Sequence, residues 1–271
     1  MCKPKTFTVI GCGKLGKTIA KLLMQNGLEL RGIYNHTQEG CLKAQQYLNL
    51  PDEKIFTDIH TLPKADAILI TVPDDVIEST AKKLPDSKKH SIVIHFSGAK
   101  TLSVLEPARK KGYQIASLHP VKSFSHPDLA VQNFPGTLCG FSGNNDAYTI
   151  VSKLFSNTGA QLFKIADDDK TLYHAACCFA ANYSVVIAFA AEKLLERTGI
   201  DRETANQIVL NLLSGTIQNI QSLGIEKSLT GPIQRRDHST IAAHIDVLAA
   251  KGEKFLELYK AAEKVACDML E

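Results

Sequence analysis

The sequence predicts two domains: an α/β domain with a doubly wound, mainly parallel sheet, followed by an all-helical domain. Short apolar segments alternate with helical patterns as far as residue 165, whereas only helical periodicity is present after Asp167. The length of 271 residues also suits two domains of ordinary size better than one. We therefore expect a first domain at 1–166 and a second at 167–271.

The composition is typical of a soluble globular protein, with 44% hydrophobic and 22% charged residues. A net charge of +3, carried by scattered basic residues, argues against nucleic-acid binding. The seven cysteines form no Cys-x-x-Cys pair, which indicates reduced thiols. The N-terminal apolar run is too short for a secretory signal, so we expect a cytoplasmic protein.

The first predicted strand, at 7–10, is followed by Gly11, Gly13 and Gly16 in Gly-x-Gly-x-x-Gly spacing, and a helical pattern then begins. This order is the context that a dinucleotide-binding loop requires. Gly11 permits a tight turn, Gly13 lets a pyrophosphate approach the backbone, and Gly16 lets the helix pack closely. We expect the pyrophosphate at the helix N-terminus, beside Lys14 and Leu15.

The second predicted strand, at 28–34, ends at Asn35-His36-Thr37. An NAD enzyme would carry Asp or Glu there for the ribose hydroxyls, and neither is present. Neutral side chains can hydrogen-bond a 2′-phosphate that a carboxylate would repel. The sequence therefore favours NADP over NAD, and the missing acid also argues against an S-adenosylmethionine-dependent methyltransferase.

The remaining elements alternate up to the domain boundary. Strands are expected at 54–57, 65–72, 91–96, 114–118, 137–142 and 161–165, helices at 39–49, 102–111 and 146–157, and the helices of the second domain at 170–197, 202–223 and 240–270. Such sheets bind ligands at the carboxyl ends of their strands. This placement predicts Val72, Pro73, Ser97 and Gly98 as cofactor-binding residues, and Ser97 and His119 as substrate-binding residues.

Two features of the second domain bear on partners. Asp167-Asp168-Asp169 suits a helix start better than a metal site, and we expect no metal. The nearly continuous apolar run 175–191 is about a turn too short for a comfortable membrane span. A helix that is apolar all round is typical of a core or a subunit interface. We expect no membrane contact and a homodimer through the helical domain.

Four motifs carry a family resemblance: Leu118-His-Pro-Val-Lys-Ser-Phe124, Leu172-Tyr-His-Ala-Ala, Ala181-Asn-Tyr183 and Leu229-Thr-Gly-Pro-Ile-Gln-Arg-Arg-Asp237. Together they resemble the bacterial family with a Rossmann-like and a DUF2520 domain. That family is similar to the 6-phosphogluconate, 3-hydroxyacid, ketopantoate and pyrroline-5-carboxylate reductase group. The resemblance implies a Rossmann-type first domain and a second domain like the C-terminal domain of 6-phosphogluconate dehydrogenase. Arg236 departs from the family, which usually has Gly there.

The related hydroxyacid and ketopantoate enzymes carry Lys-x-x-x-Asn on the first long helix of the second domain. Their Lys protonates the substrate oxygen, and their Asn holds the substrate. Asn182 matches that Asn, but Cys178 stands where the Lys would be. A thiol cannot reproduce the charge of an ammonium group. The chain must therefore use another acid, or carry out no hydride chemistry.

The catalytic candidates are His119, His174 and Asn182. His119, in a His-Pro pair similar to that of prephenate dehydrogenases, is either the proton carrier or a histidine bonded to loop backbone. His174 shares a helix face with Asn182 and either faces the cleft or pairs with an acidic neighbour. Asn182 either orients the substrate or bonds another helix. Arg235 and Arg236 either hold a substrate anion or lie in a surface loop or dimer salt bridge.

The sequence thus predicts an NADP-dependent oxidoreductase that acts on a small anionic carbonyl or imine substrate. The alternative is a catalytically silent NAD(P)-binding sensor or structural protein, which the missing Lys supports.

Overall fold

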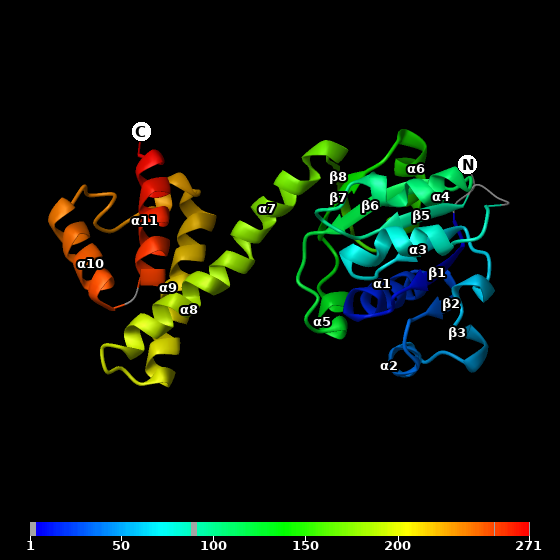
Figure 1. Cartoon of the computed structure of the whole chain (residues 1–271), viewed down its shortest axis with the longest axis horizontal. Helices are drawn as coiled ribbons and strands as arrows, with labels where there is room; N and C mark the ends of the chain where they lie inside the picture. Colours follow the sequence, from blue (N-terminus) through cyan, green and yellow to red (C-terminus); the bar gives the residue numbers. More distant parts are fainter. Residues whose placement is uncertain (1–3, 88–90, 252, 271) are drawn as a thin grey trace. The chain divides into compact units, whose positions relative to one another are not determined.

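The computed structural model describes residues 4–87, 91–251 and 253–270 (Figure 1). Cys2, one of the seven cysteines, lies outside these residues. The chain divides into two compact units, one that ends at Cys178 and one that begins at Phe179.

One eight-stranded sheet forms the centre of the first unit, in the order β3-β2-β1-β4-β5-β6-β7-β8. The strands are β1 (Thr6–Ile10), β2 (Glu29–Tyr34), β3 (Ile55–Phe56), β4 (Ala67–Ile70), β5 (Ile92–His95), β6 (Gln114–Pro120), β7 (Leu138–Ser142) and β8 (Gln161–Lys164). Neighbouring strands are parallel except for β6 and β7, which are antiparallel. The predicted mainly parallel sheet is confirmed.

Helices connect these strands. The α-helices of the first unit are α1 (Lys14–Gln25), α2 (Gln38–Leu48), α3 (Ile77–Lys83), α4 (Glu106–Lys110), α5 (Pro127–Gln132), α6 (Asn145–Phe155) and all but the last two residues of α7 (Lys170–Ala180). Short 3-10 helices are η1 (Asp52–Lys54), η2 (Ile59–Thr61), η3 (Asp74–Val76), η4 (Leu102–Leu105) and η5 (Asp167–Asp169). The short helix α5 was not predicted, and its six residues are too few to show helical periodicity.

Side chains of each strand alternate between the two faces of the sheet, and both faces are covered. Phe7 and Val9 of β1 belong to one core cluster with Ile19 of α1. Ile10 belongs to a second cluster with Ile77 of α3. Each such side chain stabilises the fold by roughly 1.5–3 kcal/mol when fully buried. The loops at the strand ends are therefore held by a packed scaffold.

The first unit extends beyond the predicted boundary after Ala166 because α7 is bonded to the sheet. Its first residue, Lys170, is bonded to Ser97 and Ser117, and Tyr173 is bonded to His119 of β6. The start of α7 thus belongs with the α/β domain, although its periodicity groups it with the helices that follow.

The second unit contains α8 (Asn182–Glu196), α9 (Arg202–Leu223), η6 (Glu226–Ser228), α10 (His238–Lys251) and α11 (Glu253–Asp268). Ala190, Leu248 and Phe255 form its buried cluster. An all-helical domain is therefore confirmed, but two predicted helices are divided. The helix expected at 240–270 is α10 and α11, on either side of residue 252, which is not described.

The helix expected at 170–197 is interrupted at Ala181, which has φ −111° and ψ −64°. The Ser184 hydroxyl donates to the carbonyl of Ala180 over 2.9 Å. Hydroxyl bonds of this kind, one turn back along a helix, often bend it.

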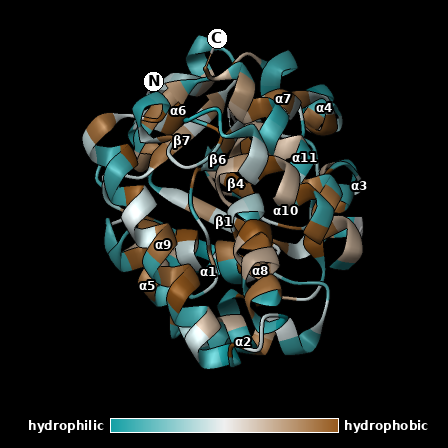
Figure 2. Cartoon of the chain, turned by 90° about the vertical axis from the view of Figure 1, so that its left-hand side faces the viewer, coloured by the Kyte–Doolittle hydropathy of each residue, from teal (hydrophilic) through white to brown (hydrophobic). Residues whose placement is uncertain are grey.

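The segment Asp167–Glu196 is 30 residues long with a mean hydropathy of 1.5, so by length and composition alone it could cross a membrane. Phe179 and Val185 within it are 70% and 69% exposed, and α8 and α9 both carry apolar turns (Figure 2). In the part of the chain that the structure describes, this segment is mostly exposed, so a core of the same chain does not cover it. A subunit interface, the other expected environment, stays a prediction.

Candidate functional site

The glycine loop after β1 is closed against the end of β4. Gly11 has φ +87°, and a Cβ there would lie 2.5 Å from Cγ1 of Val72. A Cβ on Gly16 would lie 2.6 Å from Oγ1 of Thr71. A Cβ on Gly13 would meet nothing closer than the carbonyl oxygen of Gly11, at 4.0 Å. Two of the glycines are thus required by packing and backbone conformation, whereas Gly13 borders open space.

The first turn of α1 also faces this open space. Gly13 is the N-cap residue and provides no side-chain cap, so the first N–H groups of the helix have no side-chain acceptor there. Such N–H groups, together with the helix dipole, form an anion-binding site.

A cavity of about 700 Å³ lies beside the loop. Its walls come from the glycine loop, the end of β2, the end of β4 and α3, and they include the predicted residues Gly11, Gly13, Lys14, Leu15, Asn35, His36, Thr37, Val72 and Pro73. Nδ2 of Asn35 is buried there without a hydrogen-bond partner. A buried amide without a partner is costly unless a ligand supplies one.

The same cavity contains residues that the sequence did not indicate. Ser79, Thr80 and Lys83 of α3 line it. The one signal in the sequence that could have predicted a ligand-binding role for these three residues is their place on the helix that follows β4. Lys83 and Lys14 are the two lysines that line this cavity, so a bound phosphate could interact with either ammonium group.

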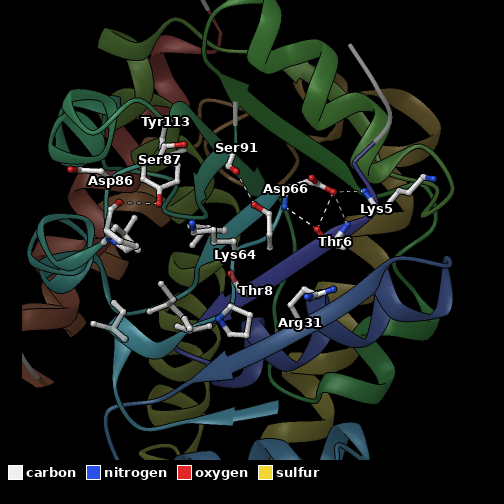
Figure 3. A pocket seen from close by; sticks show the side chains of 18 residues that line it. Lys5, Thr6, Thr8, Arg31, Lys64, Asp66, Asp86, Ser87, Ser91 and Tyr113 are labelled. Carbon is white, nitrogen blue, oxygen red and sulfur yellow. Dashed lines mark hydrogen bonds between the residues drawn. The ribbon is translucent and has the colours of Figure 1, made fainter. Parts of the chain in front are cut away.

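The second cavity, of about 430 Å³, lies at the amino ends of the strands (Figure 3). Asp66 there accepts hydrogen bonds from the backbone N–H groups of Lys5 and Thr6 and from the Thr6 hydroxyl. The Tyr113 hydroxyl donates to the carbonyl of Pro85. Because these polar groups are bonded within the protein, and the glycine loop lies at the other end of the sheet, we do not take this cavity as the functional site.

A histidine cluster occupies the carboxyl ends of β5 and β6. Nδ1 of His119 lies 2.9 Å from the Tyr173 hydroxyl, and the rings of His119 and His174 are 5.9 Å apart at an interplanar angle of 72°. A Cβ on Gly98 would lie 2.4 Å from Cδ2 of His174 and 2.9 Å from Nε2 of His119. Gly98 thus lets two imidazoles approach the backbone at one point. Sequence reasoning proposed both histidines but not the Tyr173 contact.

The pKa of His119 is lowered to about 4, first by burial and then by the charge of Lys170 and by His174, while Asp74 opposes the shift. His119 is therefore neutral at pH 7. Burial raises the pKa of Tyr173, so its phenol keeps its proton. We assign the phenol as donor to Nδ1, which leaves the proton of the neutral imidazole on Nε2, beside Gly98.

Lys170, which sequence reasoning missed, lies beneath this cluster. It is fully buried, and Nζ donates to the carbonyl oxygen of Ser97 over 3.0 Å and to Oγ of Ser117 over 2.7 Å. Burial lowers its pKa to about 8, against the opposing effect of Asp167 and Asp74. Its place after three aspartates indicated a helix start but not that its side chain reaches the sheet.

Ser97 holds its own turn together. Its hydroxyl donates to Oδ2 of Asp74 over 2.6 Å and accepts from the N–H groups of Ala99 and Lys100. The hydroxyl is therefore already bonded, and any contact of Ser97 with a ligand would compete with these bonds. Because Asp74 follows Pro73, a wall residue of the larger cavity, this bond links the cavity to the histidine cluster.

Three predicted residues belong to the second unit. Asn182 is exposed at the first position of α8, and Arg235 and Arg236 are exposed before α10. Arg236 has φ +55°, a left-handed conformation that suits glycine, which explains the Gly usual in the resembling family. Asp237 caps α10 by accepting from the N–H and the hydroxyl of Thr240. The substrate roles of Asn182 and the arginines stay predictions.

Cys178, at the position of the relatives' Lys, lies in the first unit. Its Sγ is 3.8 Å from Nδ1 of His174. The thiol thus contacts a histidine of the cluster.

Comparisons with known proteins agree with this architecture. Residues 4–120 match the Rossmann-like domain, and residues 137–265 match a domain of unknown function, DUF2520. A comparison with curated protein sequences found no match.

Solved structures with the same fold include several linked by name to NADP. A protein from Bacteroides fragilis, provisionally named an NADP oxidoreductase, is 18% identical with a TM-score of 0.78, covering 97% of this chain and 98% of its own. The imine reductase of Myxococcus stipitatus, in complex with NADP⁺, is 15% identical with a TM-score of 0.68, covering 98% and 94%. A pyrroline-5-carboxylate reductase of Coxiella burnetii is 17% identical with a TM-score of 0.60, covering 99% of each chain.

Proposed function

We propose that this chain, which carries a Rossmann-like domain followed by a DUF2520 domain, is an NADP-dependent oxidoreductase that acts on a small anionic carbonyl or imine substrate. The observation that carries the proposal is the position of His119 and His174 at Gly98, linked through Ser97 and Asp74 to the cavity beside the glycine loop. Structural relatives that bind NADP support the cofactor.

The residues present fit a dinucleotide. Gly13 and the first turn of α1 would receive the pyrophosphate. The partnerless amide of Asn35, with His36 and Thr37, would receive the ribose and its 2′-phosphate, and Lys83 would add positive charge. Val72, Pro73 and Gly98 would lie along the remainder of the cofactor. When bound, NADPH supplies a hydride.

The chain's own residues would manage the proton and the substrate. His119 would bind the reacting substrate atom through its Nε2–H, and Tyr173 would fix that tautomer through Nδ1. His174 would border the same position. Asn182 would orient the substrate, and Arg235 and Arg236 would bind its acid group, as the sequence predicts.

The test is a calorimetric titration of the protein with NADPH, NADH and S-adenosylmethionine, followed by a screen of 2-oxo acids and cyclic imines for NADPH oxidation. We expect NADPH to bind more tightly than NADH, and His119→Ala to abolish turnover with little change in NADPH affinity. Lys122→Ala, which removes an exposed ammonium bonded to the Asn133 carbonyl, is the control. Absence of binding by all three ligands would refute the proposal.

The alternative, a silent NAD(P)-binding sensor or structural protein, is supported by Cys178 in place of a charged acid. It predicts NADPH binding without oxidation of the cofactor by any member of the screen. His119→Ala would then change neither property.

We also propose that the helical unit forms a homodimer. Leu212 and Leu223 of α9 are 67% and 56% exposed, and Val185 of α8 is 69% exposed. Burying such side chains against a second copy would stabilise both helices. Sedimentation equilibrium should give a dimer for the wild-type protein and a monomer for Val185→Asp, whereas a wild-type monomer would refute the proposal.

A further inference from the structure

Lys170 is a buried ammonium group whose two hydrogen-bond acceptors, the Ser97 carbonyl and the Ser117 hydroxyl, are both neutral. Among the described residues, no carboxylate forms an ion pair with it. Burying an ammonium group costs several kcal/mol unless a charge partner offsets the cost. An uncharged side chain could connect α7 to the sheet more cheaply, so the charge itself requires an explanation.

The charge lies beneath the position where a substrate would react. The Ser97 carbonyl that accepts from Lys170 belongs to the peptide unit leading into Gly98, and Nε2 of His119 lies against Gly98. Ser117, the second acceptor, precedes His119 by two residues on β6, so both side chains point to the same face of the sheet. The ammonium group of Lys170 is therefore one hydrogen bond away from the Ser97 carbonyl, next to the position where a substrate would react.

The other groups that face His119 leave this charge dominant. From α7, Tyr173 presents a protonated phenol and His174 an imidazole. From η3, the Asp74 carboxylate is exposed and already accepts the Ser97 hydroxyl. Burial and Lys170 lower the pKa of His119, so its ring adds no charge at pH 7. Lys170 is therefore the fully buried ammonium group next to His119.

We propose that Lys170 is a positioning residue and that its buried positive charge determines the substrate class. The charge favours a carbonyl compound, because the carbonyl oxygen becomes negative during the reaction, over an iminium ion. This inference rests on the proposed oxidoreductase function. When hydride adds to a carbonyl carbon, the C=O electron pair moves to oxygen, which then takes a proton from water and gives the alcohol, while NADPH becomes NADP⁺ and hydroxide is left for the buffer to neutralise. An iminium begins with the positive charge that Lys170 would repel.

The charge effect can be measured without turnover. The titration of His119 is followed by NMR of its ring in the wild type, Lys170→Met and Lys111→Met. Lys111 is a matched control because its ammonium also donates to two neutral acceptors, the carbonyls of Lys82 and Leu84. We expect Lys170→Met to raise the His119 midpoint by about one pH unit, as expected for a charge several Å away. An unchanged midpoint would overturn the proposal.

The substrate class is tested in two ways. Binding is measured with oxamate, an unreactive analogue of a 2-oxo acid in which an amide replaces the ketone, and turnover is measured with 2-oxo acids and cyclic imines. In the presence of NADP⁺, we expect Lys170→Met to weaken oxamate binding at least tenfold, and Lys111→Met to leave it unchanged. We also expect higher kcat/KM for 2-oxo acids than for imines in the wild type. The proposal would be overturned if the wild type had a higher kcat/KM for imines than for 2-oxo acids and Lys170→Met left that ratio unchanged.

The wild-type protein provides a second measurement if Lys170→Met does not fold. Because the pKa of Lys170 is about 8, oxamate affinity should fall as pH rises from 7 to 9.5. A constant affinity would count against the inference. If NADPH does not bind at all, the proposed function fails together with the substrate class, whereas the His119 midpoint still reports the charge effect.

Discussion

The substitution Gly98→Ala tests the arrangement of the histidine cluster most directly. Its Cβ would lie 2.4 Å from Cδ2 of His174, 2.9 Å from Nε2 of His119 and 3.0 Å from its Cε1. Ordinary contacts begin at 3.4 Å, so the His174 ring would have to move by 3.4 − 2.4 = 1.0 Å. Overpacking of this kind costs about 1–3 kcal/mol.

Two readouts follow from this displacement. The melting temperature should fall by about 2–4 °C for each kcal/mol lost in a unit of this size. Turnover should fall about 100-fold, because a displacement of about 1 Å at a reacting group has an effect of that order. NADPH affinity should fall less than turnover, because the glycine loop and Asn35, which would bind the pyrophosphate and the ribose, are untouched.

Gly215→Ala is the matched control. Gly215 lies within α9, where an added Cβ would meet nothing within 4 Å. Alanine in a helix interior should stabilise the protein by about 0.5–1 kcal/mol. The reasoning is refuted if Gly98→Ala retains both the turnover and the melting temperature of the wild type.

Three further predictions concern the same site. Tyr173→Phe removes the hydrogen bond to Nδ1 of His119 and should lower kcat about 10–100-fold. The tautomer of His119 should also change, which ¹⁵N NMR of the ring would show. An unchanged spectrum would contradict the assignment of the Tyr173 phenol as donor to Nδ1. Between pH 6.5 and about 4, His119 takes up a proton in the unfolded chain but not in the folded one. As the pH falls through this range, the free energy of unfolding, measured by urea denaturation, should therefore fall by up to about 3 kcal/mol more in the wild type than in His119→Gln. The same pH dependence in both proteins would show that the pKa of His119 is not lowered by folding. Lys83→Ala should weaken NADPH binding more than NADH binding in calorimetry, and equal losses would place the 2′-phosphate elsewhere.

The sheet and the glycine loop could be predicted because their signals are local. The apolar run before Gly11 indicates a buried strand, and the spacing of Gly11, Gly13 and Gly16 specifies a turn and a helix start within a few residues. The division at Ala181 was missed because the apolar pattern continues across it, and the Ser184 hydroxyl bond to the Ala180 carbonyl leaves no mark in that pattern.

The candidate site could be predicted only in part, because only some of its residues lie in a local sequence pattern. His119 was accessible because it ends a predicted strand, and strand ends carry ligands in parallel sheets. Lys170 and Tyr173 reach the sheet only after the chain has passed through β7, α6 and β8. Contacts over such separations leave no spacing pattern in one sequence.

The strand order has a further consequence for the size of the ligand. The predicted ligand-binding residues follow the carboxyl edge: Asn35 comes after β2, Gly11 after β1, Val72 after β4 and Gly98 after β5, and His119 lies near the end of β6. Four strand spacings of about 4.8 Å separate the first from the last, or roughly 19 Å. Because β7 runs antiparallel to β6, its carboxyl end lies at the opposite edge, and the row stops at His119. A ligand would therefore have to be about 19 Å long to contact both Asn35 and His119, which is a length that the proposed dinucleotide and its substrate would reach together and a mononucleotide alone would not.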